Sequence, residues 1–197
     1  MRVRLGRRED TETLSALAIQ VWLHTYATKG VSSVMASYVL SEFSPARFAS
    51  LLSESSSGVF VAEHGKNLLG YAVVRTSAAC PIPSISGAEL ATLYVQEPFL
   101  GKGVGASLLR HVEVWAAERM RTPIWLTTNS QNGRAIAFYA KHGYTKVGIT
   151  FFELGNEKHE NVVLVEQPPK QRTVRRYRLL KSSLGIKPNH SSRLANE

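Results

Sequence analysis

Three alternating glycines lie between an apolar segment and a helical pattern near the middle of this 197-residue chain. They belong to the segment Leu100-Gly101-Lys102-Gly103-Val104-Gly105. Glycine lets the backbone approach a ligand closely, and the first amides of a helix point at an anion with the helix dipole behind them. A strand, a glycine turn and a helix in this order favour a bound phosphate group. A tight turn that caps the helix fits the same residues.

Two common nucleotide-binding motifs do not fit this turn. A dinucleotide-binding turn needs an acidic residue about 20 positions further on, at the end of the next strand. The next apolar segment, residues 124–129, contains no acid. A P-loop needs Gly-Lys followed by Ser or Thr after four spacer residues, and the turn lacks that sequence. Neither motif therefore identifies the phosphate.

The periodicity of apolar residues predicts one domain that mixes helices and strands. Alternation of strands and helices in this order is typical of an α/β or α+β sheet with helices on both faces. The expected strands cover residues 3–5, 58–63, 68–76, 85–95, 123–128, 144–153 and 162–166, and the expected helices begin near Asp10, at Ser44-Pro45, at Gly103 and at Asn132.

Composition and charge exclude several classes of protein. No apolar stretch approaches the roughly 20 residues that cross a bilayer, and the basic N-terminus is not followed by the apolar core of a signal peptide. A single cysteine, Cys80, cannot form an internal disulfide. We therefore expect a cytoplasmic protein without a membrane contact.

Most of the net charge of +9 lies in the last 28 residues. Residues 170–197 hold eight Lys or Arg and one acid, Glu197. Such a segment can be a solvated extension, a segment that docks on a partner subunit, or an arm for an acidic surface. We favour the first two over a contact with nucleic acid.

Two motifs at a characteristic spacing identify a family. The first is Glu89-Leu90-x-x-Leu93-Tyr94-Val95-x-x-Pro98-x-Leu100-Gly101-Lys102-Gly103-Val104-Gly105, and the second is Asn132-x-x-Ala135-Ile136-x-Phe138-Tyr139-x-x-x-Gly143-Tyr144. Together they resemble the central and second motifs of the GNAT superfamily of N-acetyltransferases. Leu100 departs from the family, which usually has Gln or Arg there, and it removes one polar anchor.

The resemblance covers residues 1–167 and implies a GNAT acetyltransferase domain, followed by a basic C-terminal extension at 168–197. It implies a GNAT-like central mixed, mostly antiparallel sheet of about seven strands with helices on both faces. It also implies acetyl-CoA as the acyl donor and a primary amine of a small molecule or peptide as the acceptor. A homodimer would be consistent with the family.

The resemblance places the donor on the two motifs. The strand Leu93-Tyr94-Val95 would pair its backbone with the pantetheine arm, as a peptide adds to a sheet edge. The amides from Gly101 to Ala106 would hold the pyrophosphate, and Lys102 would either add charge or stay solvated. Asn132 would bond to the pantetheine arm, cap its helix, or do both. The implied cofactor-binding residues are Leu93, Tyr94, Val95, Gly101, Lys102, Gly103, Val104, Gly105, Ala106, Asn132 and Tyr139.

Two side chains are the candidate catalytic residues. Tyr139 would face the cofactor sulfur and donate a proton or hydrogen bond to the leaving thiolate, although a core aromatic fits the same position. Glu89 would accept the proton of the attacking amine, directly or through water, although a solvent-facing edge residue fits as well. Amides near Val95 would stabilise the tetrahedral oxyanion.

The acceptor side is less well defined by the sequence. Plausible lining residues are Trp22, Tyr26, Phe43 and the loop at 81–86, and packing in the core is the default for Trp22. The histidines show no metal-ligand spacing, so we expect no metal. The alternatives to an amine acetyltransferase are a CoA-binding sensor without catalysis and an acyltransferase directed to nucleic acid by the basic tail.

Overall fold

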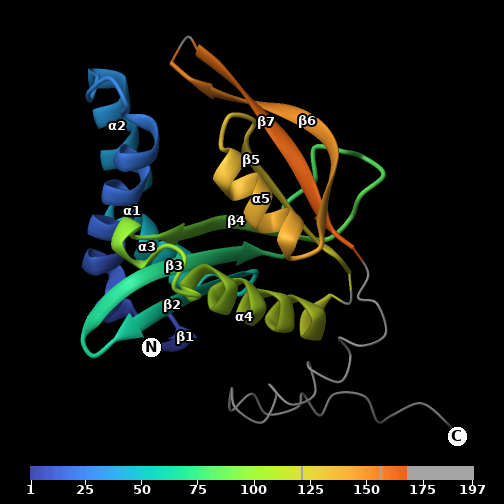
Figure 1. The fold of residues 1–197 in the computed structure, drawn as a ribbon. Coiled ribbons are helices and arrows are strands. Elements are labelled where there is room, and N and C mark those ends of the chain that lie inside the picture. Colours follow the sequence, from blue (N-terminus) through green and yellow to red (C-terminus); the bar gives the residue numbers. More distant parts are fainter. Residues whose placement is uncertain (121, 156, 168–197) are drawn as a thin grey trace, which may run out of the picture. The chain divides into compact units, whose positions relative to one another are not determined.

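The computed structural model describes residues 1–120, 122–155 and 157–167. The expected basic extension at 168–197 lies outside this part. The helices and strands, with two short 3-10 turns, follow in chain order (Figure 1): β1 (Arg2–Leu5), η1 (Arg8–Asp10), α1 (Thr11–Tyr26), α2 (Ser33–Glu42), α3 (Pro45–Ser53), β2 (Ser57–His64), β3 (Asn67–Arg75), β4 (Ala88–Val95), η2 (Glu97–Phe99), α4 (Val104–Arg119), β5 (Ile124–Asn129), α5 (Gly133–Lys141), β6 (Tyr144–Leu154) and β7 (Glu157–Glu166).

The strands form one sheet in the order β1-β2-β3-β4-β5-β7-β6. Every neighbouring pair is antiparallel except β4 and β5, which are parallel. The expected mixed, mostly antiparallel sheet of about seven strands is therefore confirmed. None of the helices in the described part is both long and apolar enough to cross a membrane.

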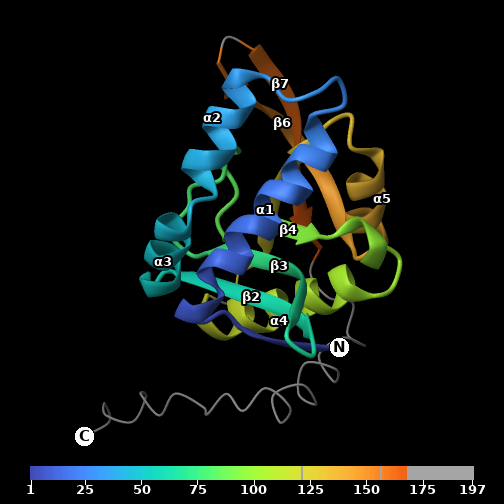
Figure 2. The same ribbon diagram turned by 90° about the vertical axis from the view of Figure 1, so that its left-hand side faces the viewer.

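Two hydrophobic cores lie on opposite faces of the sheet. One is built around α4 and α5 and includes Leu108, Trp115 and Tyr139. The other is built around α1 and α3 and includes Leu14, Phe48 and Tyr71. Figure 2 shows α1 in front of strands β2 and β3 and α4 behind them. Helices therefore cover both faces, as the sequence predicts.

One helix and the starts of two strands differ from the expectation. Helix α2 is missed by the sequence analysis, although Ser32 caps it by accepting a hydrogen bond from the Met35 amide. The strand expected from residue 85 begins only at Ala88, because a turn holds the preceding segment through the bond from the Ile85 amide to the Ile82 carbonyl. Strand β7 begins at Glu157 rather than at residue 162.

The parallel pair β4–β5 is much shorter than the strands that form it. Only two residues of β4 pair with β5, Ala88 with Ile124 and Glu89 with Trp125. On its other edge β4 stays paired with β3 as far as Val95. A bulge at Ala91 bends β4 within this ladder, because Val73 lies opposite Thr92 while Val74 lies opposite Leu90. The sheet therefore opens between β4 and β5 beyond Glu89, and the two strands diverge in Figure 1.

Two carboxyl groups meet between α4 and the end of β7. The Tyr144 hydroxyl donates to Glu113 at 3.4 Å, and Glu166 accepts from the Ile124 amide at 3.2 Å. The pKa of Glu113 is raised to about 7, first by burial and then by the neighbouring Glu166 carboxylate. The Tyr144 bond and Arg110 act in the opposite direction.

This carboxyl gives a prediction for stability against pH. Because its pKa is higher in the folded state, protonation of Glu113 stabilises the fold fully below about pH 4.5, and that contribution is lost as the pH rises through about 7. The free energy of unfolding of Glu113→Gln, relative to that of the parent, should therefore increase by about 1–3 kcal/mol from pH 5 to pH 8. Urea unfolding at both pH values measures the gain. The control Glu12→Gln, at an exposed position of α1, should show no such gain, and an equal gain would refute the assignment.

Candidate donor and acceptor site

The glycine turn connects the end of β4 to α4 through a backbone that only glycine adopts easily. Gly101 and Gly103 have φ values of 73° and 82°, in the left-handed region. Gly103 is the N-cap of α4, and no side chain caps the helix there. A Cβ at either glycine would meet nothing within 4 Å, so the backbone conformation and not crowding selects glycine.

The start of α4 presents amides that the helix itself does not use. The first bond of the helix runs from the Ser107 amide to the Gly103 carbonyl at 3.0 Å. The amides of Val104, Gly105 and Ala106 precede that bond, so they have no carbonyl four residues earlier within the helix. The predicted pyrophosphate site therefore has the geometry that anion binding requires.

Two side chains flank these amides. Leu100 is 37% exposed, so an apolar side chain lies at the surface where the family usually has a polar one. The Lys102 ammonium lies 5.7 Å from the centre of the Phe99 ring. Lys102 therefore holds a positive charge on the turn and forms no ion pair with a carboxylate of the described residues.

The free edge of β4 leads directly into this turn. From Leu90 to Val95 the strand has β3 on one side and no ladder with β5 on the other. The backbone of Leu93, Tyr94 and Val95 can therefore accept an extended ligand on the β5 side, as a sheet edge does. The structure brings this segment and residues 101–106 into one continuous stretch.

The second motif forms the start of α5 beside α4. The Asn132 side chain accepts a hydrogen bond from the Ala135 amide at 3.1 Å, which makes it the N-cap of α5. This bond uses the carbonyl oxygen and leaves the amide NH₂ group available. The Phe138 ring lies 3.5 Å from the place where a Cβ of Gly105 would be. A side chain at Gly105 would therefore touch Phe138.

Tyr139 is 7% exposed and packs between Phe138 and Tyr144, at ring-centre distances of 5.2 and 5.6 Å. Its hydroxyl has no hydrogen-bond partner among the residues that the structure describes. Burial raises the pKa of Tyr139 above its ordinary value, and the nearby Tyr26 phenol raises it further. The phenol therefore stays protonated, and it lies within electrostatic reach of α1.

Glu89 lies at the closed end of the opening between β4 and β5, which we call the split. It pairs with Trp125 on β5 and with Arg75 on β3, and its carboxylate is 3.7 Å from the Arg75 guanidinium. Burial raises the pKa of Glu89, and Arg75 partly offsets this effect. Six residues of strand, or about 20 Å, separate it from Val95. Glu89 is therefore distant from Val95, where the oxyanion amides are expected.

A chain of aromatic contacts lies on the α1 side of the sheet, opposite α4 and α5. Trp22 contacts both Tyr26 and Tyr38, at ring-centre distances of 5.0 and 5.2 Å. Three of the expected lining residues, Trp22, Tyr26 and Phe43, are part of this group. The further contacts are Tyr38 with Phe43 at 6.0 Å, Tyr38 with Phe152 at 5.8 Å, Phe43 with Tyr94 at 6.3 Å and Tyr71 with Tyr94 at 5.6 Å.

Sequence analysis missed two members of this aromatic cluster, which we define as Trp22, Tyr26, Tyr38, Phe43, Tyr94 and Phe152. Tyr38 is on the unpredicted helix α2, and Phe152 is on β6, more than 100 residues away. The spacing of Val34, Tyr38 and Val39 in the sequence could have indicated the helix. No local signal links Phe152 to the other rings.

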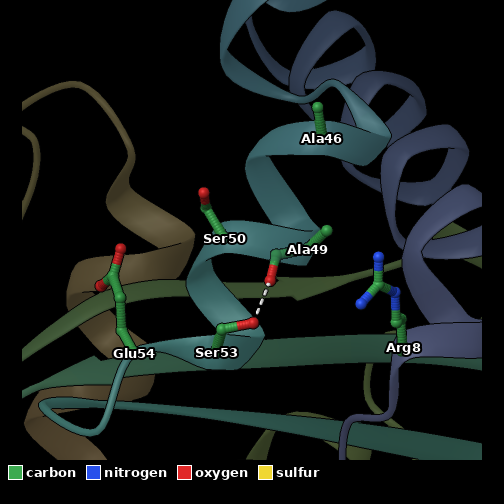
Figure 3. Close-up of a pocket in the computed structure, with 6 residues that line it drawn as sticks. All are labelled: Arg8, Ala46, Ala49, Ser50, Ser53 and Glu54. Carbon is green, nitrogen blue, oxygen red and sulfur yellow. Dashed lines mark hydrogen bonds between the residues drawn. The ribbon is translucent and has the colours of Figure 1, made fainter.

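A separate pocket of about 550 Å³ lies along α3, as Figure 3 shows. Its lining is mostly small side chains, with Arg8 and Glu54 at its edges. The Ser53 hydroxyl donates to the Ala49 carbonyl within the helix at 2.9 Å. None of the lining residues belongs to the predicted site, and we assign the pocket no role.

The comparison with protein families decides between the classes of protein considered above. Residues 20–144 match the model of the acetyltransferase (GNAT) family. The chain belongs to this family. A GNAT domain makes it an acyltransferase with a binding site for a CoA-derived donor, and the non-catalytic alternative is not favoured.

Two bacterial relatives match this chain, and one of them is named as an N-acetyltransferase. An uncharacterized N-acetyltransferase of Mycobacterium tuberculosis is 29% identical over 158 residues, which is 80% of this chain and 97% of the relative. An uncharacterized protein of Bacillus subtilis is 31% identical over 113 residues, covering 56% of this chain and 69% of its own length.

Solved structures share the fold at low sequence identity. The PaiA N-acetyltransferase of Thermoplasma acidophilum, crystallised in complex with coenzyme A, superposes with a TM-score of 0.70 at 21% identity, over 85% of this chain and all of that one. The ribosomal-protein-S18-alanine N-acetyltransferase of Escherichia coli superposes with a TM-score of 0.60 at 15% identity, over 86% and 96% of the two chains.

The left-handed N-cap gives a prediction for the GNAT turn. Gly103→Ala should lower the free energy of unfolding by about 1–2 kcal/mol, because a residue with a Cβ is strained at this φ although the space is open. Gly133→Ala is a matched control: it is also a helix-start glycine with open space, but its φ is not in the left-handed region. Urea unfolding of both variants measures the difference, and equal stabilities would contradict the assignment.

Proposed function

We propose that this chain transfers an acetyl group from acetyl-CoA to a primary amine of a small molecule or peptide, by direct attack within a ternary complex. The observation that carries the proposal is the unpaired edge of β4 that runs into the free amides of the glycine turn. A thioester cofactor with a long amide-containing arm and a pyrophosphate matches both parts of this arrangement.

The donor would lie along the split. The arm would bond to the backbone of Leu93, Tyr94 and Val95, and the Asn132 NH₂ group would donate to it from the other side. The amides from Gly101 to Ala106 would hold the pyrophosphate. The solvated Lys102 would add charge, while Leu100 contributes only a surface for van der Waals contact.

Tyr139 would act on the leaving sulfur as a hydrogen-bond donor. A free phenol has a pKa of about 10 and a thiol about 8.5, so complete proton transfer to the thiolate is already unfavourable by roughly 2 kcal/mol. Burial raises the pKa of Tyr139 further. A hydrogen bond that stabilises the thiolate is therefore the better role, and the thiolate takes its proton later from water.

Glu89 would receive the amine proton through intervening water. Its raised pKa makes the carboxylate a better base than an exposed glutamate. The distance along β4 from Glu89 to Val95 rules out a direct transfer from an amine that attacks near Val95. The amide groups near Val95 would stabilise the oxyanion of the tetrahedral intermediate.

The remaining features fit this proposal without adding to it. The single Cys80 is consistent with a reducing cytoplasm. An acyltransferase directed to nucleic acid would depend on residues 170–197, and no contact in the described part favours that acceptor. The domain boundary after residue 167, the tail and a homodimer stay expectations.

Binding of the donor can be measured by thermal unfolding of the full chain. Acetyl-CoA at 100 times its Kd should stabilise the fold by about 2.7 kcal/mol and raise the melting temperature. NAD, which also carries a pyrophosphate, is the control and should give no shift. An unchanged melting temperature at millimolar acetyl-CoA would overturn the proposal, and a shift with NAD alone would restore the dinucleotide interpretation of the turn.

The catalytic roles can be separated by substitution. Tyr139→Phe should lower kcat about 10- to 100-fold, because a hydrogen bond to a charged group is worth about 1.5–3 kcal/mol, while the acetyl-CoA melting shift is retained. Tyr144→Phe, which removes the neighbouring phenol, is the control and should keep its kcat. In the parent, protonation of the Glu89 carboxylate should lower kcat/KM at low pH. Glu89→Gln should remove this pH dependence. Unchanged turnover in both Tyr139→Phe and Glu89→Gln would show that these assignments are wrong.

A further inference from the structure

The aromatic cluster gathers rings from distant parts of the chain on one side of the split. Helix α1 supplies Trp22 and Tyr26, α2 supplies Tyr38, and β6 supplies Phe152. Apart from the buried Trp22, these rings are only half-buried. Phe43 and Tyr94, the other two members of the cluster, are half-buried as well, so five of its six aromatic residues keep part of their surface exposed.

The cluster is tied to the donor strand by Tyr94, which lies on β4. The centre of the Tyr94 ring is 6.3 Å from that of Phe43 and 5.6 Å from that of Tyr71. Tyr26 also contributes to the raised pKa of Tyr94. A molecule held against the rings can therefore present a nitrogen to a thioester that lies along β4.

The rings themselves carry no charge. Burial raises the pKa of Tyr26, Tyr38 and Tyr94 above the ordinary value of a phenol. All three phenols are protonated at neutral pH. The cluster therefore offers apolar area and electron-rich ring faces, and the latter attract a cation.

The charged groups on the same elements are either paired or exposed to solvent. Glu42 at the end of α2 is paired with Arg47 at 3.6 Å, Glu153 with Lys158 at 3.1 Å, and Glu157 with the His159 ring at 3.5 Å. The candidate base Glu89 is paired with Arg75. Lys29, three residues beyond Tyr26, is exposed to solvent. In the described part of the chain, these elements therefore place no buried cation beside the rings that could hold a carboxylate or a phosphate.

We propose that the acceptor is a primary amine on an uncharged aromatic body, an arylalkylamine, whose ring packs in the aromatic cluster while its nitrogen points to the split. This inference rests on the proposed acetyl transfer. The nitrogen lone pair attacks the thioester carbon, the carbon–sulfur bond breaks, and the electron pair leaves on sulfur. The proton lost from nitrogen passes to the carboxylate or water, so that the products are an amide and the CoA thiol.

The test uses the full chain, acetyl-CoA and three amines, with release of the CoA thiol as the readout. 2-Phenylethylamine has the ring and one ammonium, L-phenylalanine adds only a carboxylate, and 1,4-diaminobutane replaces the ring by a second ammonium. We expect kcat/KM for 2-phenylethylamine to exceed both others at least tenfold. Equal or faster turnover of either competitor overturns the inference, and loss of L-phenylalanine turnover in Lys29→Ala would identify a carboxylate site instead.

Substitutions locate the ring. Tyr38→Ala and Phe152→Ala should each raise the KM for 2-phenylethylamine at least fivefold with a smaller effect on kcat. Phe151→Ala is the matched control, because Phe151 neighbours Phe152 but is 57% exposed and pairs with Glu160. If Tyr38→Ala and Phe152→Ala both keep the KM and the melting temperature of the parent, the acceptor binds elsewhere and the inference is wrong.

The failure of this inference can be told apart from the failure of the proposed function. If acetyl-CoA raises the melting temperature and other amines are acetylated while 2-phenylethylamine is not, only the acceptor class is wrong. If acetyl-CoA neither binds nor is consumed with any amine, the proposed function itself is wrong. Quenching of tryptophan fluorescence by 2-phenylethylamine provides a binding readout that needs no turnover.

Discussion

Strand β4 belongs to two ladders that end at different places. With β3 it forms a full antiparallel ladder up to Val95, and with β5 it forms a parallel ladder of two residues. Backbone groups in the middle of a sheet normally bond to a neighbouring strand. Beyond Glu89 the groups on the β5 side lack that neighbour, so they are open to water or to a ligand. The unpaired backbone of Leu93, Tyr94 and Val95, which continues into the glycine turn, follows from this divergence.

The helices on the two faces keep the split in place. Helix α4 packs on one face through fully buried side chains such as Leu108 and Val112. Helices α1 and α3 pack on the other through Leu14 and Phe48. A strand without a partner on one edge is held by its faces instead, which apolar burial stabilises at about 25 cal/mol per Å². The open edge therefore needs no lid or extra strand to be stable.

Much of the fold could be predicted from the sequence because its signals are local. Alternating apolar residues predicted the hairpin of β2 and β3, and Ser44-Pro45 predicted the start of α3. The glycine turn identified the start of α4, since left-handed φ values at Gly101 and Gly103 require that residue type. These signals depend on neighbours within about ten residues.

The acceptor side could not be predicted in the same way. Tyr38 and Phe152 meet only after β6 has folded back beside α2, and neither residue has a distinctive local sequence. The bulge at Ala91, which bends β4, also leaves no clear mark in the sequence. The length of a partial ladder such as β4–β5 depends on how helices pack against both faces of the sheet. The periodicity of apolar residues along one strand carries no information about that packing.

The donor and the acceptor would be recognised by different parts of the chain. Along β4 and at the start of α4 the groups offered to a ligand belong to the backbone, so many substitutions there preserve them. In the aromatic cluster the groups offered are side chains from four separate elements. Evolution can therefore change the acceptor by single replacements at Tyr38 or Phe152 while the donor site stays intact. Paralogues that share the same turn can consequently diverge in the amines they modify.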